Sequence, residues 1–155
     1  LSETLSVQRT MLRILHYPAY DPATVEAGQI RSAQHEDINW ITVLPAGSTK
    51  GLQLCLDGET WSDVPFARES IIVNIGDMLQ ELTAGRFRST THRVVTSEDA
   101  TPGLERMSVP CFIHAKKEVV LSHRNGSPFT ADDYLMNRLT QLERMNDNSD
   151  VKTTD

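Results

Sequence analysis

Short apolar runs, rich in β-branched residues and separated by turns that contain proline or glycine, recur along most of the chain. Apolar runs of this length, several of them alternating with polar residues, predict β-strands. We expect strands at Met11–Tyr17, Gln34–Leu44, Leu52–Leu56, Trp61–Val64, Ser70–Ile75, Ser89–Val95 and Arg106–His114, the last of these being the final clear strand. Many short strands at nearly regular spacing predict an all-β barrel or jelly roll.

The segments between these runs predict specific connections. Asp57-Gly58 is a strong hairpin signal between two short strands. Ser70–Ile75 is nearly continuous in apolar residues, which predicts a strand buried on both faces. Pro18–Ala27 and Ser97–Leu104 are expected to be loops, and 78–82 is expected to be a short strand or a turn of helix.

The C-terminal region has a different, helical pattern. Thr130 is a suitable N-cap, and the two aspartates that follow Ala131 suit the first turn of a helix. The helical spacing of Leu135, Leu139, Leu142 and Met145 predicts a packing face. We therefore expect residues 1–10 to be a remnant of a preceding helical region or linker, 11–145 to be one β domain with this helix at its end, and 146–155 to be a flexible tail.

Composition narrows the class of protein. A chain of 155 residues is about one domain, and a net charge of −6 argues against nucleic-acid or anionic-membrane partners. No stretch reaches membrane-spanning length, and we expect no signal peptide. Cys55 and Cys111 are far apart and are expected to be small buried apolar residues rather than a disulfide, which suits a reducing, cytoplasmic location.

The candidate chemistry begins with His35-Glu36-Asp37. On an extended strand, His35 and Asp37 would share a face and could bind one metal ion. His92, on a remote strand, is the candidate third ligand. Two imidazoles and one carboxylate leave three coordination positions open, as in non-haem Fe(II) oxygenases, although catalytic zinc also uses such a set. Taken singly, the H-x-D pair is typical of a solvated strand end and His92 of a core histidine. His16, His114 and His123 are assigned no metal role.

A second candidate group is Arg106-Met107-Ser108. On a strand, Arg106 and Ser108 share a face, and a guanidinium can make two hydrogen bonds to one carboxylate. A buried Arg106 would need an anionic partner, from the protein or from a ligand. The alternative is a surface arginine paired with Glu105, and spacing alone does not separate the two interpretations.

Together these residues resemble the iron(II)- and 2-oxoglutarate-dependent dioxygenases, specifically the isopenicillin N synthase-like group. The resemblance runs from about Met11 to about Leu142. It rests on five landmarks in the same order, namely Leu12–Pro18, His35–Asp37, Asn74–Asp77, Ser89–Val94 and Arg106–Ser108. Leu15 departs from the pattern because many plant members carry asparagine there, and the N-terminal half of the family has no counterpart in this sequence.

The resemblance implies a double-stranded β-helix (jelly roll) and a small-molecule substrate. His35, Asp37 and His92 would hold Fe(II), while Arg106, Ser108 and Tyr17 would bind the distal carboxylate of 2-oxoglutarate. The family consumes dioxygen, converts 2-oxoglutarate to succinate and oxidises its substrate, usually by hydroxylation. Phe112, on the same strand face as Arg106 and Ser108, is a weaker candidate for the substrate pocket, and a core role is its alternative.

Two other functions stay open at the level of sequence. One is an iron oxidase of the isopenicillin N synthase type, in which the Arg-x-Ser pair holds the substrate carboxylate and 2-oxoglutarate is not used. The other is a non-catalytic β-helix module that binds a ligand or is a truncated product.

Overall fold

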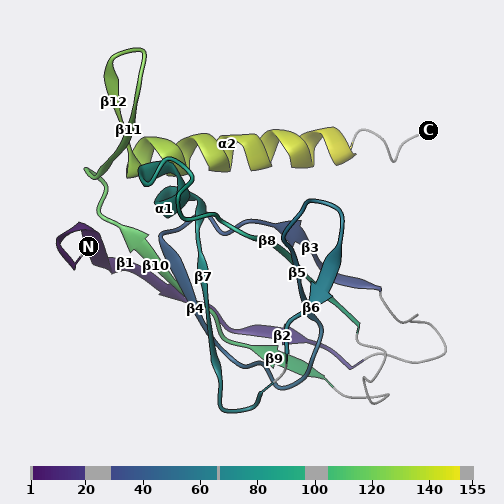
Figure 1. Cartoon of the computed structure of the whole chain (residues 1–155). Coiled ribbons are helices and arrows are strands. Elements are labelled where there is room, and N and C mark those ends of the chain that lie inside the picture. Colours follow the sequence, from purple (N-terminus) through teal and green to yellow (C-terminus); the bar gives the residue numbers. More distant parts are fainter. Residues whose placement is uncertain (1, 20–28, 66, 97–104, 151–155) are drawn as a thin grey trace.

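The computed structural model describes residues 2–19, 29–65, 67–96 and 105–150, and its body is two four-stranded antiparallel sheets. The first sheet has the order β1 (Leu5–Leu12), β10 (Cys111–Ala115), β4 (Ile41–Pro45) and β7 (Ile71–Ile75). The second has the order β3 (Ile30–His35), β8 (Thr91–Val95), β5 (Leu52–Cys55) and β6 (Trp61–Asp63). The two sheets lie on opposite sides of the view in Figure 1.

Smaller elements close the ends of this body. Strands β2 (Leu15–Tyr17) and β9 (Arg106–Ser108) form a separate antiparallel pair, and β11 (Val120–Arg124) and β12 (Ser127–Thr130) form a hairpin. The 3-10 turn η1 covers Ser2–Thr4, and helix α1 covers Asp77–Leu82. Helix α2 (Ala131–Asp150) runs across the end of the sheets next to α1, opposite the β2–β9 pair (Figure 1).

The chain crosses repeatedly between the two sheets. Strand β3 belongs to the second sheet, β4 to the first, β5 and β6 to the second, β7 to the first and β8 to the second. Because the chain alternates between the sheets in this way, its strands form a double-stranded β-helix. The prediction of an all-β fold with a C-terminal helix is therefore confirmed. The Asp57-Gly58 hairpin is also confirmed, because β5 pairs with β6 and Gly58 has a φ of +88°. No helix in the described ranges is long and apolar enough to cross a membrane.

The expected domain boundary at residue 10 is wrong. Residues Leu5–Leu12 are an edge strand of the first sheet, with Leu5 opposite Ala115 and Leu12 opposite Cys111. Ser6 is the one buried residue of this strand, so polar residues such as Gln8 can occupy its exposed positions and still allow the pairing. This segment is therefore part of the domain.

Three predicted strands are each broken into two. Met11–Tyr17 divides into β1 and β2, and Arg106–His114 divides into β9 and β10 at Pro110, which has no N–H to donate to a sheet. The two breaks lie side by side, because the Arg13 N–H donates to the Pro110 carbonyl at 3.0 Å. Gln34–Leu44 divides into β3 and β4, and Asp37 therefore lies in the loop after β3 and not on a strand.

The core lies under the start of α2. Trp40, Met78, Leu79, Ala115, Leu121 and Ala131 form a cluster of buried side chains, with Leu135 of α2 packed against it. By contrast, β7 was expected to be buried on both faces and is not, since Ile71 is 64% exposed and Val73 59% exposed. The described residues thus cover only one face of that strand.

The C-terminal region extends beyond the prediction. The β11–β12 hairpin was missed, although its Asn125-Gly126 turn, with φ of 52° and 78°, is typical of a tight hairpin. The helix start is confirmed by a reciprocal cap: the Thr130 N–H donates to Asp133 Oδ2 at 2.9 Å, and the Asp133 N–H donates to Thr130 Oγ1 at 3.2 Å.

Two predictions for this helix need correction. The backbone of α2 continues to Asp150, so the expected tail, which starts at 146, begins inside this helix. Leu139 and Leu142 are 42% and 44% exposed, so the predicted packing face holds for Leu135 but not for these two. The predicted loop at 97–104 and most of the predicted loop at 18–27 lie outside the described residues.

Candidate metal centre and co-substrate cavity

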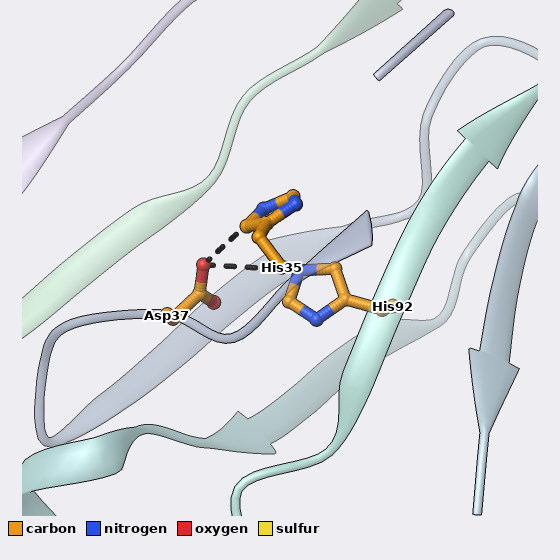
Figure 2. A group of neighbouring side chains, drawn as sticks. All are labelled: His35, Asp37 and His92. Atoms are coloured by element: carbon orange, nitrogen blue, oxygen red, sulfur yellow. Dashed lines mark ion pairs between the residues drawn. The ribbon is translucent and has the colours of Figure 1, made fainter. Parts of the chain in front are cut away.

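The three predicted metal ligands meet at one point of the structure. His35 ends β3, Asp37 follows it in the loop, and His92 lies on β8, directly opposite His35 in the sheet register. One potential ligand atom from each lies within 4.8 Å of the others. Figure 2 shows the Asp37 carboxylate turned toward both imidazoles, and Asp37 Oδ1 is 3.8 Å from His35 Nε2 and 3.7 Å from His92 Nε2.

Hydrogen bonds fix which oxygen of Asp37 faces the histidines. Thr42 Oγ1 donates to Asp37 Oδ2, and Asn74 Nδ2 donates to the same oxygen at 2.8 Å. Asn39 Nδ2 in turn donates to Thr42 Oγ1 at 2.8 Å, which orients that hydroxyl. Because Oδ2 is occupied by two donors, Oδ1 is the oxygen left to bind a cation. Such outer partners orient metal ligands and raise metal affinity.

The two histidines are held in the same way. Nδ1 of His35 lies 2.7 Å from the carbonyl oxygen of Ala33, and Nδ1 of His92 lies 3.0 Å from that of Thr90. A carbonyl can only accept, so in each ring Nδ1 carries the proton and Nε2 keeps its lone pair for a metal. The donor set of two imidazole nitrogens and one carboxylate oxygen therefore fits a divalent transition metal with open positions.

The loop that carries Asp37 is clamped by the start of α1. The Asp77 N–H donates to the Asp37 carbonyl at 2.9 Å, and the Gly76 N–H donates to the Trp40 carbonyl at 3.0 Å. A Cβ on Gly76 would lie 2.1 Å from Asn39 Oδ1 and 2.3 Å from the Asn39 carbonyl oxygen, so only glycine permits this approach. This gives a physical reason for the Asn74–Asp77 landmark: its asparagine orients the carboxylate and its last two residues hold the loop.

The cluster opens into a cavity of about 470 Å³ between the two sheets. Its walls are largely apolar, and its charged lining residues include Arg106. Arg106 is only 3% exposed, and its Nε and Nη1 have no hydrogen-bond partner. Burial lowers the pKa of its guanidinium, and nearby Arg31 lowers it further, against an opposing contribution from Tyr17. A buried cation with two unpaired nitrogen atoms, facing a cavity that also holds a metal-ligand cluster, is suited to a carboxylate ligand.

The other predicted cofactor and substrate residues line the same cavity. Ser108 is 5% exposed, and the Arg106 guanidinium carbon lies 5.2 Å from the centre of the Tyr17 ring. Phe112 also lines the cavity, from β10. Leu15, the departure from the plant pattern, lies opposite Ser108 in the β2–β9 register, and its side chain offers no hydrogen bond there.

The burial of Arg106 separates its two interpretations. Arg106 is not a surface arginine paired with Glu105, because Glu105 pairs with His16 instead. Among the described residues, the cluster of potential metal ligands contains His35, Asp37 and His92 and none of the other histidines. Burial lowers the pKa of His114, and the Arg9 charge adds to this effect.

Sequence reasoning missed the residues that orient Asp37. Thr42 and Asn74 lie in otherwise apolar strands, and a lone polar residue in such a strand is the signal that could have found them. Arg13 and Arg31, which also line the cavity, were not considered.

Comparison with known proteins places the chain in a family. Residues 9–115 match the profile described as the 2OG-Fe(II) oxygenase superfamily. The chain belongs to this superfamily. Membership of this superfamily, together with the His-Asp-His cluster, supports Fe(II) and 2-oxoglutarate as its cofactor and co-substrate. It is 31% identical, over 142 residues, to a flavonol synthase/flavanone 3-hydroxylase of Petunia hybrida, covering 85% of this chain and 38% of that enzyme.

Solved structures of other proteins share this jelly-roll fold. A protein from Shewanella oneidensis described as an oxygenase is 50% identical with a TM-score of 0.75, covering 87% of this chain and 48% of its own. A full-length Neurospora crassa protein, solved in complex with alpha-KG, is 26% identical with a TM-score of 0.78, covering 90% of this chain and 46% of its own. The chain thus spans about half the length of these two solved structures and 38% of the Petunia hybrida enzyme.

Proposed function

We propose that this chain is an Fe(II)- and 2-oxoglutarate-dependent dioxygenase that oxidises a small molecule by hydroxylating a C–H bond held next to its metal. The observation that carries the proposal is Arg106, a buried guanidinium with two unpaired nitrogen atoms in the cavity that contains the His-Asp-His cluster. A metal ligand set alone would suit several chemistries, whereas a buried carboxylate receptor beside it suits a chelating 2-oxo acid.

Metal binding and co-substrate binding would take place at two different ends of the cavity. His35 Nε2, Asp37 Oδ1 and His92 Nε2 would hold Fe(II), and Arg106, Ser108 and Tyr17 would bind the distal carboxylate of 2-oxoglutarate. Leu44, Leu52, Leu54, Ile72 and Val94 line the cavity as well and would exclude water from the bound co-substrate. When bound, Fe(II) supplies the activation of dioxygen that couples decarboxylation of 2-oxoglutarate to succinate with oxidation of the substrate.

The test is release of succinate from 2-oxoglutarate in the presence of Fe(II), ascorbate and dioxygen. Wild-type protein is expected to release succinate, and the Asp37→Ala variant to release none above the background without protein. Asp63→Ala removes a carboxylate from β6, outside the cavity lining, and is the matched control. Equal turnover in wild type and Asp37→Ala would refute the proposal.

A second candidate is an iron oxidase that does not use 2-oxoglutarate. Leu15 opposite Ser108 favours it, because one hydrogen bond to the distal carboxylate is missing at this position. In that case Arg106 and Ser108 would hold a carboxylate of the substrate itself. Calorimetric titration of metal-loaded protein with 2-oxoglutarate separates the two: saturable binding supports the dioxygenase, and its absence supports the oxidase.

The proposal includes a cytoplasmic location. Cys55 and Cys111 are both free, which suits a reducing compartment.

A further inference from the structure

We infer that the substrate is an apolar molecule with one acidic group, and that Arg13 binds that group at the open side of the cavity. The inference rests on the proposed function and extends it to the chemical class of the substrate. Arg13 lines the cavity and is exposed, and no carboxylate of the described residues pairs with it.

The strand register places Arg13 on the cavity side. Tyr17 lies opposite Arg106 and Leu15 opposite Ser108, and the Arg13 N–H donates to the carbonyl of Pro110. Residues two apart on extended backbone point to the same side. Arg13, Leu15 and Tyr17 therefore form one row of side chains, and all three line the cavity.

The same register gives the offset, along the strands, between Arg13 and the residues that hold the metal cluster. Phe112 lies opposite Thr42, which in turn lies opposite Asn74, and Thr42 and Asn74 are the two residues that hold Asp37. Arg13 is level with Pro110, two residues from Phe112, which corresponds to about 7 Å along a strand. Arg13 and the residues that hold Asp37 thus lie at different levels along the strands, and an acidic substrate would extend from Arg13 toward the metal cluster.

The charge of the cavity explains why the substrate should carry an acidic group. Asp37 is the only carboxylate among the described residues that line the cavity. With neutral histidines, Fe(II), the Asp37 carboxylate, the 2-oxoglutarate dianion and Arg106 sum to zero charge. Arg31 also lines the cavity, and its Nη2 donates to the Pro18 carbonyl at 2.6 Å, a neutral partner that orients the guanidinium without cancelling its charge. Arg13 pairs with no carboxylate of the described residues, so its positive charge adds to that of the cavity, and an acidic group on the substrate would offset it.

The surroundings of Arg13 determine the rest of the ligand. Leu15, Pro110 and Phe112 line the cavity next to it and offer no hydrogen bonds from their side chains. A ligand that satisfies both features has an apolar or aromatic body and a terminal carboxylate. A neutral apolar substrate is the alternative outcome of the test.

The test compares the binding of 4-phenylbutyrate with that of 4-phenylbutyramide, which has nearly the same shape but no charge. Calorimetry is performed on the full chain loaded with Mn(II) and saturated with 2-oxoglutarate, whose own affinity is measured first in every protein. The acid is expected to bind wild type about tenfold more tightly than the amide, because hydrogen bonds to charged groups are the stronger ones. This preference should disappear in Arg13→Gln and persist in Arg13→Lys.

Arg86→Gln, which removes an exposed arginine that does not line the cavity, is the matched control and should keep the preference. Equal binding of acid and amide by wild type, no binding of either, or a preference that survives in Arg13→Gln would overturn the assignment. Failure of 2-oxoglutarate to bind wild type would instead refute the proposed function, so the two failures are distinguishable.

Discussion

The two ends of the cavity are built on opposite principles. At the metal end, the atoms next to the ligand atoms already have partners: Asp37 Oδ2 accepts from Thr42 and Asn74, and the histidine Nδ1 atoms face backbone carbonyls. At the other end, Arg106 is buried with two unpaired nitrogen atoms. The metal end is preorganised by the protein, whereas the arginine end is left incomplete until a ligand arrives.

This difference has an energetic meaning. Satisfied hydrogen bonds at the metal end stabilise the empty protein and fix its ligand geometry. An unpaired buried guanidinium destabilises the empty protein and is compensated only by a bound carboxylate. Substitutions at the two ends should therefore affect stability in opposite directions while both weaken the loaded state.

Arg106→Met should produce the largest effect, lowering the affinity for 2-oxoglutarate while raising the stability of the ligand-free protein. We expect the affinity for 2-oxoglutarate to fall on the order of 100-fold, because charge-assisted hydrogen bonds to the distal carboxylate are lost. The ligand-free variant should be more stable than wild type by about 1–3 kcal/mol, because a buried unpaired polar group is removed. Calorimetry and urea denaturation measure the two quantities. A ligand-free variant less stable than wild type would show that the unpaired Arg106 does not destabilise the empty protein, and the contrast between the two ends would then fail.

Asn74→Ala tests the metal end. It removes one of the two donors to Asp37 Oδ2, and we expect metal affinity to fall about 10–100-fold, as for other partners of metal ligands. Titration with Mn(II) followed by a competing chelator measures the change. Gln53→Ala, on β5 and outside the cavity lining, is the control and should leave metal affinity unchanged.

Gly76→Ala tests the clamp on the Asp37 loop. Its Cβ would collide with backbone and side-chain oxygens of Asn39, and we expect a loss of about 2 kcal/mol in the free energy of unfolding, as in other overpacked sites. Gly58→Ala, in the hairpin with φ of +88° and no neighbour near its Cβ, should cost about 1 kcal/mol and leave metal affinity unchanged. Equal metal affinity in Gly76→Ala and wild type would show that the clamp does not position Asp37.

The smallest effect concerns the support of α1. Hydrogen bonds from Ser122 and Arg124 lower the pKa of Glu81, so this carboxylate stabilises the fold when ionised. Its contribution is present above the unfolded pKa of about 4.3 and is lost as the pH falls through the lower folded pKa. Glu81→Gln should be less stable than wild type at pH 7, and the difference should shrink as the pH falls below the unfolded pKa and through the lower folded pKa. Denaturant titrations across this range measure it, and a difference that grows toward low pH would contradict the account.

The sequence was informative wherever a pattern is local. Asp57-Gly58 specified its hairpin and Thr130 its helix start, because the turn or cap is made by adjacent residues. Residue types made His35, Asp37 and His92 candidates for one site, but their convergence rested on the family resemblance, because no local rule places β8 beside β3. The structure brings the three together, although Asp37 reaches the cluster from a loop and not from a strand, and their binding of a metal stays a prediction.

The misses follow from interactions between remote segments. Pro110 interrupts one long strand, and Arg13, beside it, marks the corresponding break in the neighbouring strand. The two segments stay paired on both sides of the break, as β1 with β10 and β2 with β9. Such a break depends on pairing that one segment alone does not encode. The exposure of Ile71 and Val73 likewise depends on what covers the outer face of β7, which an apolar run cannot specify.

One measurement tests the central claim directly: an anomalous-scattering map from crystals grown without oxygen in the presence of Fe(II) and 2-oxoglutarate. The account predicts a single iron bonded to His35 Nε2, Asp37 Oδ1 and His92 Nε2, with the distal carboxylate of 2-oxoglutarate on Arg106. Iron bound elsewhere, a fourth protein ligand that closes the coordination sphere, or an Arg106 that stays unpaired would contradict it.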